Sequence, residues 1–126
     1  MKSIIFLMIF TPALMATPIN LEEIANAISS GNASALAKHF ASDVDVIVLD
    51  DINMYTKAEA EKAMADFFTK NKPLKYTQVH QGESQGATGQ YCVGVLETTN
   101  QKYRVNLYLE KTGGKFLIKE IKFENQ

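Results

Sequence analysis

The chain has 126 residues, a length that suits one domain of modest size. Its 13 basic and 14 acidic side chains leave a formal net charge of −1, so the charge does not indicate a nucleic-acid partner. One cysteine, Cys92, excludes an internal disulfide, and its place in an apolar strand favours a small buried side chain.

The first sixteen residues have the pattern of a secretory signal peptide. Lys2 supplies the positive start, residues 4–10 are a continuous apolar run, and Ala16 is the expected last residue before cleavage. The apolar run is too short to span a bilayer stably. The sequence therefore predicts an exported chain, periplasmic or secreted, in which residues 17–126 form a single domain without membrane attachment after cleavage.

The segment that follows has helical periodicity. Asn20 stands three positions before Glu23, which is a capping-box arrangement. Apolar residues then recur at helical spacing as far as Ile28, and Gly31 is expected to end this helix. A second short helix is expected to run to Phe40 and to form a hairpin with the first.

A strand and a longer helix are expected next. Residues 44–49 are rich in β-branched side chains, which favours a strand, and Met54-Tyr55 is the expected return strand. Thr56 and Glu59 have the spacing of a second capping box. The helix that they begin is expected to reach about Asn71.

The last third of the chain alternates between apolar and polar residues, as antiparallel strands do. A three-residue turn ending on Gly114 pairs Val105 with Ile121, whereas a two-residue turn pairs Val105 with Lys122. The first register is expected because it keeps one face apolar. The predicted meander has strands at residues 75–83, 90–98, 102–111 and 115–124.

This register sorts the side chains onto two faces, provided that the loop around Thr99-Asn100 has an odd number of residues. The inner face then comprises Tyr91, Val93, Val95, Tyr103, Val105, Leu107, Leu109, Leu117, Ile121 and Phe123. The outer face combines Cys92, Leu96, Tyr108, Phe116 and Ile118 with Arg104, Asn106, Glu110, Glu120 and Lys122. Such a partly apolar outer face suits a protein interface.

The order helix, helix, strand or hairpin, helix and four strands carries a resemblance. Residues 28–32 precede a short helix, residues 55–60 open the third helix, and residues 113–116 turn into the last strand. In these features the chain resembles the nuclear transport factor 2-like superfamily, which includes ketosteroid isomerase and polyketide cyclase-like proteins. The resemblance implies an α+β cone, a curved antiparallel sheet with three helices packed on its concave face.

A narrower resemblance covers the strands. It is to a family of small exported bacterial proteins of unknown function within that superfamily, and it implies the fold more than any activity. The residues that carry it are His80-Gln81-Gly82-Glu83-Ser84, Tyr91, Gly94, Leu96, Thr98 and Tyr103-Arg104-Val105.

The sequence predicts a binding domain more readily than an enzyme. Enzymes of the resembled superfamily place an Asp, Tyr or His inside the cone, but the expected inner face has no ionisable group beyond two tyrosines. No metal-ligand spacing, cofactor loop or catalytic motif is present. We therefore expect a non-enzymatic interaction domain that forms a homodimer through its sheet. The candidate interface is Leu96, Arg104, Tyr108, Phe116 and Ile118.

The alternative is a carrier of a small apolar ligand, or an enzyme with His80 as its acid or base; a structural role for this histidine is also open. A pocket of roughly 300 Å³ opening onto His80 would favour the alternative. A cone filled by Phe40, Phe67, Phe68 and Phe123 would weaken it. The candidate pocket residues are Tyr55, Phe68, His80 and Tyr91.

Overall fold

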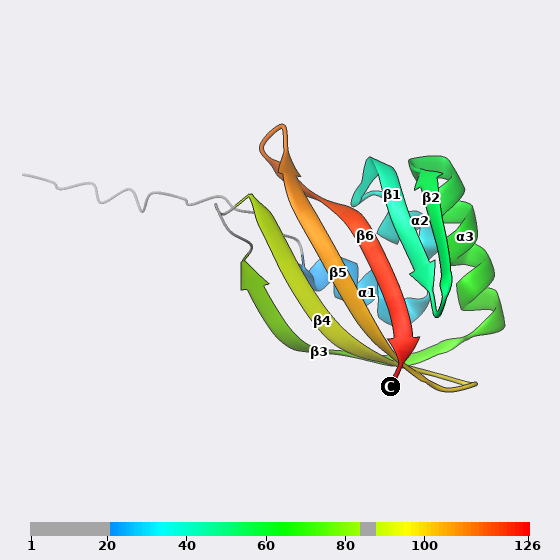
Figure 1. Ribbon diagram of the computed structural model, residues 1–126. Helices are drawn as coiled ribbons and strands as arrows, with labels where there is room; N and C mark the ends of the chain where they lie inside the picture. The colour runs from blue at the N-terminus through cyan, green and yellow to red at the C-terminus, as the bar shows by residue number, and fades with distance from the viewer. Residues whose placement is uncertain (1–20, 84–87) are drawn as a thin grey trace, which may run out of the picture.

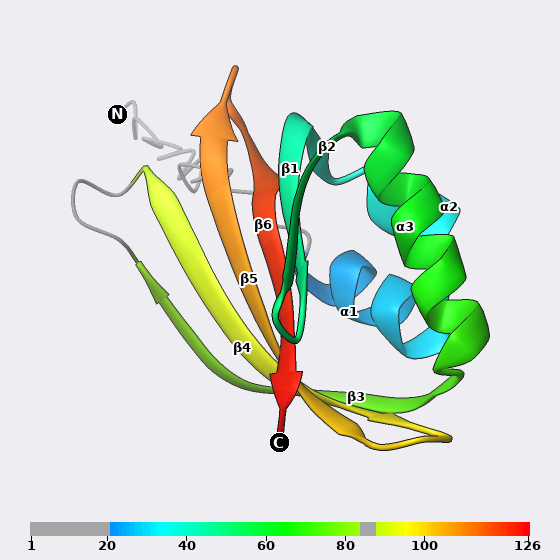
Figure 2. The same cartoon turned by 45° about the vertical axis from the view of Figure 1, so that its right-hand side comes forward.

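The computed structural model describes residues 21–83 and 88–126. The predicted signal segment and the predicted cap Asn20 lie outside these residues. The described chain is an α+β structure in which a curved six-stranded sheet carries three helices on its concave side (Figures 1 and 2). The predicted fold class is confirmed.

Local capping signals define the helix ends. Gly31 has a φ of 67°, and the Asn32 side chain accepts a hydrogen bond of 2.9 Å from the Ala35 N–H. The predicted Thr56 capping box is present, but Phe40 is not helical as expected: it is fully buried and begins the first strand. The helices are α1 (Leu21–Ser30), α2 (Ala33–Ala37) and α3 (Lys57–Lys70).

All six expected strands belong to one sheet, in the order β2-β1-β6-β5-β4-β3. Neighbours are antiparallel except β1 and β6, which run parallel and join the N-terminal hairpin to the meander. The strands are β1 (Phe40–Val48), β2 (Asp51–Thr56), β3 (Pro73–Glu83), β4 (Gly89–Thr98), β5 (Lys102–Thr112) and β6 (Lys115–Asn125).

The predicted register between β5 and β6 is wrong. Thr112 pairs with Lys115 around a two-residue turn, and Gly113 and Gly114 both have positive φ, as this tight hairpin requires. A bulge at Lys119 then adds one residue to β6, so the apolar pairing recovers further along the ladder. In consequence Phe116 and Ile118 are buried on the inner face, and Leu117 lies on the outer face.

The predicted faces of β4 are also reversed. Four residues separate the last paired residues of β4 and β5, so the connection is even and Leu96 lies opposite Tyr103. Cys92 and Leu96 are buried against the helices, whereas Tyr91, Val93 and Val95 face outward. The predicted inner positions of the β5 residues are confirmed by their burial.

The edge strand β3 is bent by two bulges, at Leu74 and Val79. Because the second bulge shifts the alternation by one residue, Tyr76 faces the inner side and His80 the outer side. The Tyr76 ring covers Gly94, and burial raises the pKa of its hydroxyl. His80 is therefore directed away from the cone, contrary to the geometry on which its candidacy was based.

Aromatic side chains fill the space between the sheet and the helices. The Phe67 ring centroid lies 4.2 Å from that of Phe123 and 5.2 Å from that of Tyr103. Phe40 and Phe68 are buried in the same cluster. The cone is thus packed as a hydrophobic core.

Candidate functional site

The core of the described chain contains no buried Asp, Glu, His, Lys or Arg side chain. Among its buried residues, the polar side-chain groups are those of Gln90 and Thr98 and the hydroxyl of Tyr103, and burial raises the pKa of the Cys92 thiol. Within residues 21–83 and 88–126, no cluster of three metal-ligating side chains occurs. In the same part of the chain, none of the helices has the length and apolarity to cross a membrane.

The structure does not bring the four candidate pocket residues into one pocket. Tyr55 lies on β2 beside α3, and Phe68 belongs to the core. His80 and Tyr91 face outward from β3 and β4. Phe68, Tyr55 and His80 each line a different depression, and Tyr91 lines none of these three.

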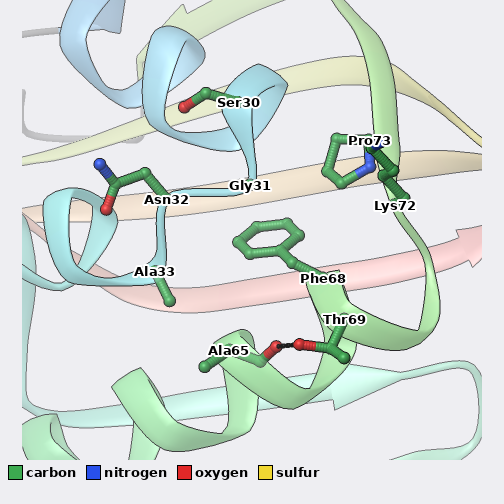
Figure 3. Close-up of a pocket in the computed structure, with 9 residues that line it drawn as sticks. All are labelled: Ser30, Gly31, Asn32, Ala33, Ala65, Phe68, Thr69, Lys72 and Pro73. Atoms are coloured by element: carbon green, nitrogen blue, oxygen red, sulfur yellow. Dashed lines mark hydrogen bonds between the residues drawn. The ribbon is translucent and has the colours of Figure 1, made fainter.

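The first depression lies where the α1–α2 turn approaches the end of α3, and has a volume of about 540 Å³. Figure 3 shows the Phe68 ring between Asn32 and Pro73, with Ser30 and Lys72 near the rim. The polar side chain of Thr69 is already used, since its hydroxyl donates to the Ala65 carbonyl at 2.8 Å. This hollow has no convergent set of free catalytic groups among the residues that line it.

The second depression separates α3 from the β1–β2 hairpin and has a volume of about 300 Å³. Tyr55, Asp66 and Lys70 line it above Val46 and Phe67. At its end Asn71 accepts hydrogen bonds from the Tyr103 hydroxyl and from Asn100, at 2.9 and 3.0 Å. These bonds close the core, so a structural role accounts for this polar cluster.

The third depression is on the outer sheet face and has a volume of about 340 Å³. We call it the outer-face groove. Arg104 at its rim forms no ion pair within the described part of the chain, and the neighbouring Val79 is 61% exposed. An apolar floor beside a cation has the chemistry that suits an apolar group or an anion. The groove is lined by Val79, His80, Val93, Val95, Arg104 and Gln126.

An aromatic pair adjoins this groove. Tyr91 and Tyr108 lie directly opposite each other on β4 and β5, with ring centroids 4.9 Å apart, and Tyr91 is 49% exposed. On β6, Lys122 Nζ lies 2.9 Å from Glu124 Oε1, and this contact holds the pKa of the Glu124 carboxyl below its usual range. The outer face thus combines apolar, aromatic and charged groups.

Only part of the predicted interface lies on this face. Arg104 and Tyr108 face outward, as expected. Leu96, Phe116 and Ile118 are core residues, so their predicted outward placement is wrong. The structure replaces them with Val79, Val93 and Val95, which sequence reasoning missed because a bulge and an even loop decide their face.

The curved sheet and its three helices define the class of protein. A designed protein with a curved β-sheet superposes with a TM-score of 0.66 at 15% identity, covering 85% of this chain and 97% of that chain. An NTF-2-like protein of unknown function from Silicibacter pomeroyi gives 0.61 at 12% identity, covering 84% and 89%. The fold is therefore nuclear transport factor 2-like.

Within this class the family can be stated. The family model for a domain of unknown function, DUF4783, matches residues 21–124, and the chain belongs to that family. A family protein from Bacteroides ovatus is 30% identical, with a TM-score of 0.78 over 82% of this chain and 93% of that chain. One from Bacteroides uniformis is also 30% identical, with 0.79 over 83% and 95%. No curated protein matches the sequence.

Proposed function

We propose that this protein is an exported, non-enzymatic binding module that works through the outer face of its sheet, where two copies associate. The observation that carries the proposal is the contrast between the two faces. Helices and aromatic rings fill the inner face, whereas the outer face exposes Val79 and Tyr91 around a groove. The signal-peptide pattern of residues 1–16 supports export.

Self-association requires a surface that complements itself, because a two-fold axis applies the same face to both copies. The outer face carries Arg104 and Lys122 among the acidic Glu110, Glu120 and Glu124. A two-fold contact can set acidic positions against basic ones. It can also set the protruding tyrosine pair against the groove, and tyrosine and arginine are enriched in such interfaces.

The test is the molar mass of the chain without residues 1–16, measured by size-exclusion chromatography with light scattering. We expect self-association, and we expect Tyr108→Glu to lower the molar mass, since each copy at the outer face would bury an unpaired carboxylate. The expected loss is about 2 kcal/mol per site and about 4 kcal/mol for the two sites of the contact, which is roughly a thousandfold weaker association.

Two variants control this measurement. Tyr108→Phe keeps the ring and should keep the wild-type molar mass, and Ser34→Glu adds the same charge on an exposed helix position. Circular dichroism should show the same fold for all of them. A wild-type chain that stays monomeric up to about 1 mM would contradict self-association, because such an affinity is worth no more than about 4 kcal/mol.

A second candidate is a carrier for a small apolar ligand. It is favoured by one observation, that the outer-face groove opens onto His80, although outside the cone. The guanidinium of Arg104 beside an apolar floor suits a carboxylate with a hydrocarbon chain. NMR titration with decanoate and with decanol tests this: a carrier shifts the amides of Val93 and Val95 with decanoate alone, and loses the response in Arg104→Gln. Unchanged spectra with both compounds would reject it.

A further inference from the structure

The two edges of the sheet differ in how they are protected. The β3 edge has two bulges, begins at Pro73 and carries Lys75. The β2 edge pairs with β1 in an uninterrupted register over all six residues, Asp51 to Thr56. Bulges, prolines and lysines are the usual means of preventing an edge strand from pairing with another chain. Strand β2 itself contains none of them.

A hydrogen bond and the strand pairing of the hairpin show which backbone groups of β2 face outward. The Leu49 N–H donates to the Phe123 carbonyl at 2.8 Å, on the β6 side of β1. Because N–H groups along a strand alternate sides, the N–H of Val48 points to β2. The N–H of Asp51, which pairs with Val48, therefore points to β1. The N–H groups of Asn53 and Tyr55 also point to β1, by the same alternation.

The remaining residues of β2 direct their N–H and carbonyl groups to the free edge. At Thr56 the N–H donates to a Glu59 carboxylate oxygen at 3.0 Å, so this outward donor is already used. Ile52 and Met54 have no such partner within the described part of the chain. They therefore offer two donors and two acceptors for another strand.

The same two residues carry the most exposed large apolar side chains of the described chain. Ile52 is 70% exposed and Met54 is 76% exposed, both on the outer side of the sheet next to Ile47. Exposed apolar groups gathered beside free backbone groups are a feature of strand-addition sites.

We propose that β2 is a second self-association site, at which the β2 strands of two copies pair antiparallel across a two-fold axis with Asn53 opposite Asn53 of the partner subunit. In this register Ile52 lies opposite Met54 of the partner subunit, and the pair exchanges both backbone hydrogen bonds. The two-fold axis repeats the exchange, so four free donors are satisfied. The four apolar side chains gather on one face of the joined sheet.

The neighbouring register, centred on Met54, fits less well. Pairing Met54 with its own copy brings Ile52 opposite Thr56, whose N–H is occupied by Glu59. The Asn53-centred register instead sets the acidic end of one strand, at Asp51, near the Lys57 that follows the other strand. Hydrogen-bond supply and charge complementarity therefore favour a second copy of this chain in this register. This site is separate from the outer-face groove and goes beyond the proposed function.

Cysteine crosslinking tests the register directly. Opposed residues of a non-hydrogen-bonded antiparallel pair have Cα atoms about 4.5 Å apart, within the range of a disulfide. We expect Asn53→Cys to give a disulfide dimer on mild oxidation, seen on a non-reducing gel. Asp51→Cys is the matched control, because its two copies lie about 13 Å apart along the strands in this register. The wild-type chain shows how much crosslinking the buried Cys92 gives by itself. Equal crosslinking of the two variants, or none by Asn53→Cys, overturns the proposal.

Light scattering separates this site from the outer face. Met54→Pro removes a free-edge donor and is compatible with an edge strand, whereas Met54→Leu keeps the donor. In the Tyr108→Glu background, Met54→Pro should reduce the molar mass from dimer to monomer, and Met54→Leu should not. A mass unaffected by Met54→Pro overturns the edge pairing even where Tyr108→Glu alone lowers the mass. A mass that falls with Met54→Pro but not with Tyr108→Glu rejects the outer-face contact and leaves the edge pairing in place.

Discussion

Gly94 is the position where one added carbon is expected to have a large effect. A Cβ there would lie 2.4 Å from Cζ and the hydroxyl oxygen of Tyr76. Carbon atoms pack best about 3.5–4.0 Å apart, so the ring would have to move by about 1 Å or more. Its hydroxyl has no well-formed hydrogen bond to any described residue, and because the hydroxyl is buried near Cys92 the ring has little room to move. We expect Gly94→Ala to lower the free energy of unfolding by about 2–3 kcal/mol.

Urea unfolding followed by circular dichroism measures this change. Gly82→Ala is the matched control in the neighbouring strand, because its Cβ would meet only His80 Nε2, at 3.5 Å. It should leave stability equal or slightly higher, since alanine restricts the unfolded chain more than glycine. Removing the ring with Tyr76→Ala should abolish most of the cost of Gly94→Ala. A wild-type midpoint for Gly94→Ala, or an equal cost with and without the ring, would refute this account.

Two further predictions concern the helical layer. Burial lowers the pKa of His39, although Glu23, 3.4 Å away, acts to raise it. The unfolded chain then binds the proton more readily, so stability is present above the unfolded pKa of about 6.5 and is lost as pH falls through the folded value. His39→Gln should reduce the change in the urea midpoint between pH 7 and pH 5. A pH dependence equal to that of the wild type would contradict the role given to His39. Thr56→Ala, which removes the acceptor for the Glu59 N–H, should cost about 1 kcal/mol in the same assay at pH 7, and Thr56→Ser clearly less.

The helix ends and strand positions could be predicted because their signals are local. A capping residue such as Thr56 acts within four residues, and a positive φ at Gly31 ends a helix wherever the helix packs. Alternation within β5 likewise reported its inner face correctly, since no bulge interrupts its pairing with β4. The one local failure, Phe40, began a strand because its ring was needed in the core.

The candidate site could be predicted only in part. Tyr108 and Arg104 lie in the well-predicted β5 and were placed on the correct face. His80 was placed relative to Tyr76 by counting residues, and the Val79 bulge makes that count fail. Arg104, which was expected on the outer face, and His80, which was a candidate for the cone, both line the outer-face groove.

Local sequence patterns predicted the order of elements, their approximate bounds and the apolar character of one face, because each depends on neighbours within a few residues. Which side chains share that face in β3, β4 and β6 depends instead on how the whole sheet packs. One bulged residue or one extra loop residue reverses a strand's faces, and both choices are made by the summed burial of the whole sheet. The bulge at Lys119 reconciles a two-residue glycine turn with an apolar core, which no count along the chain could reveal.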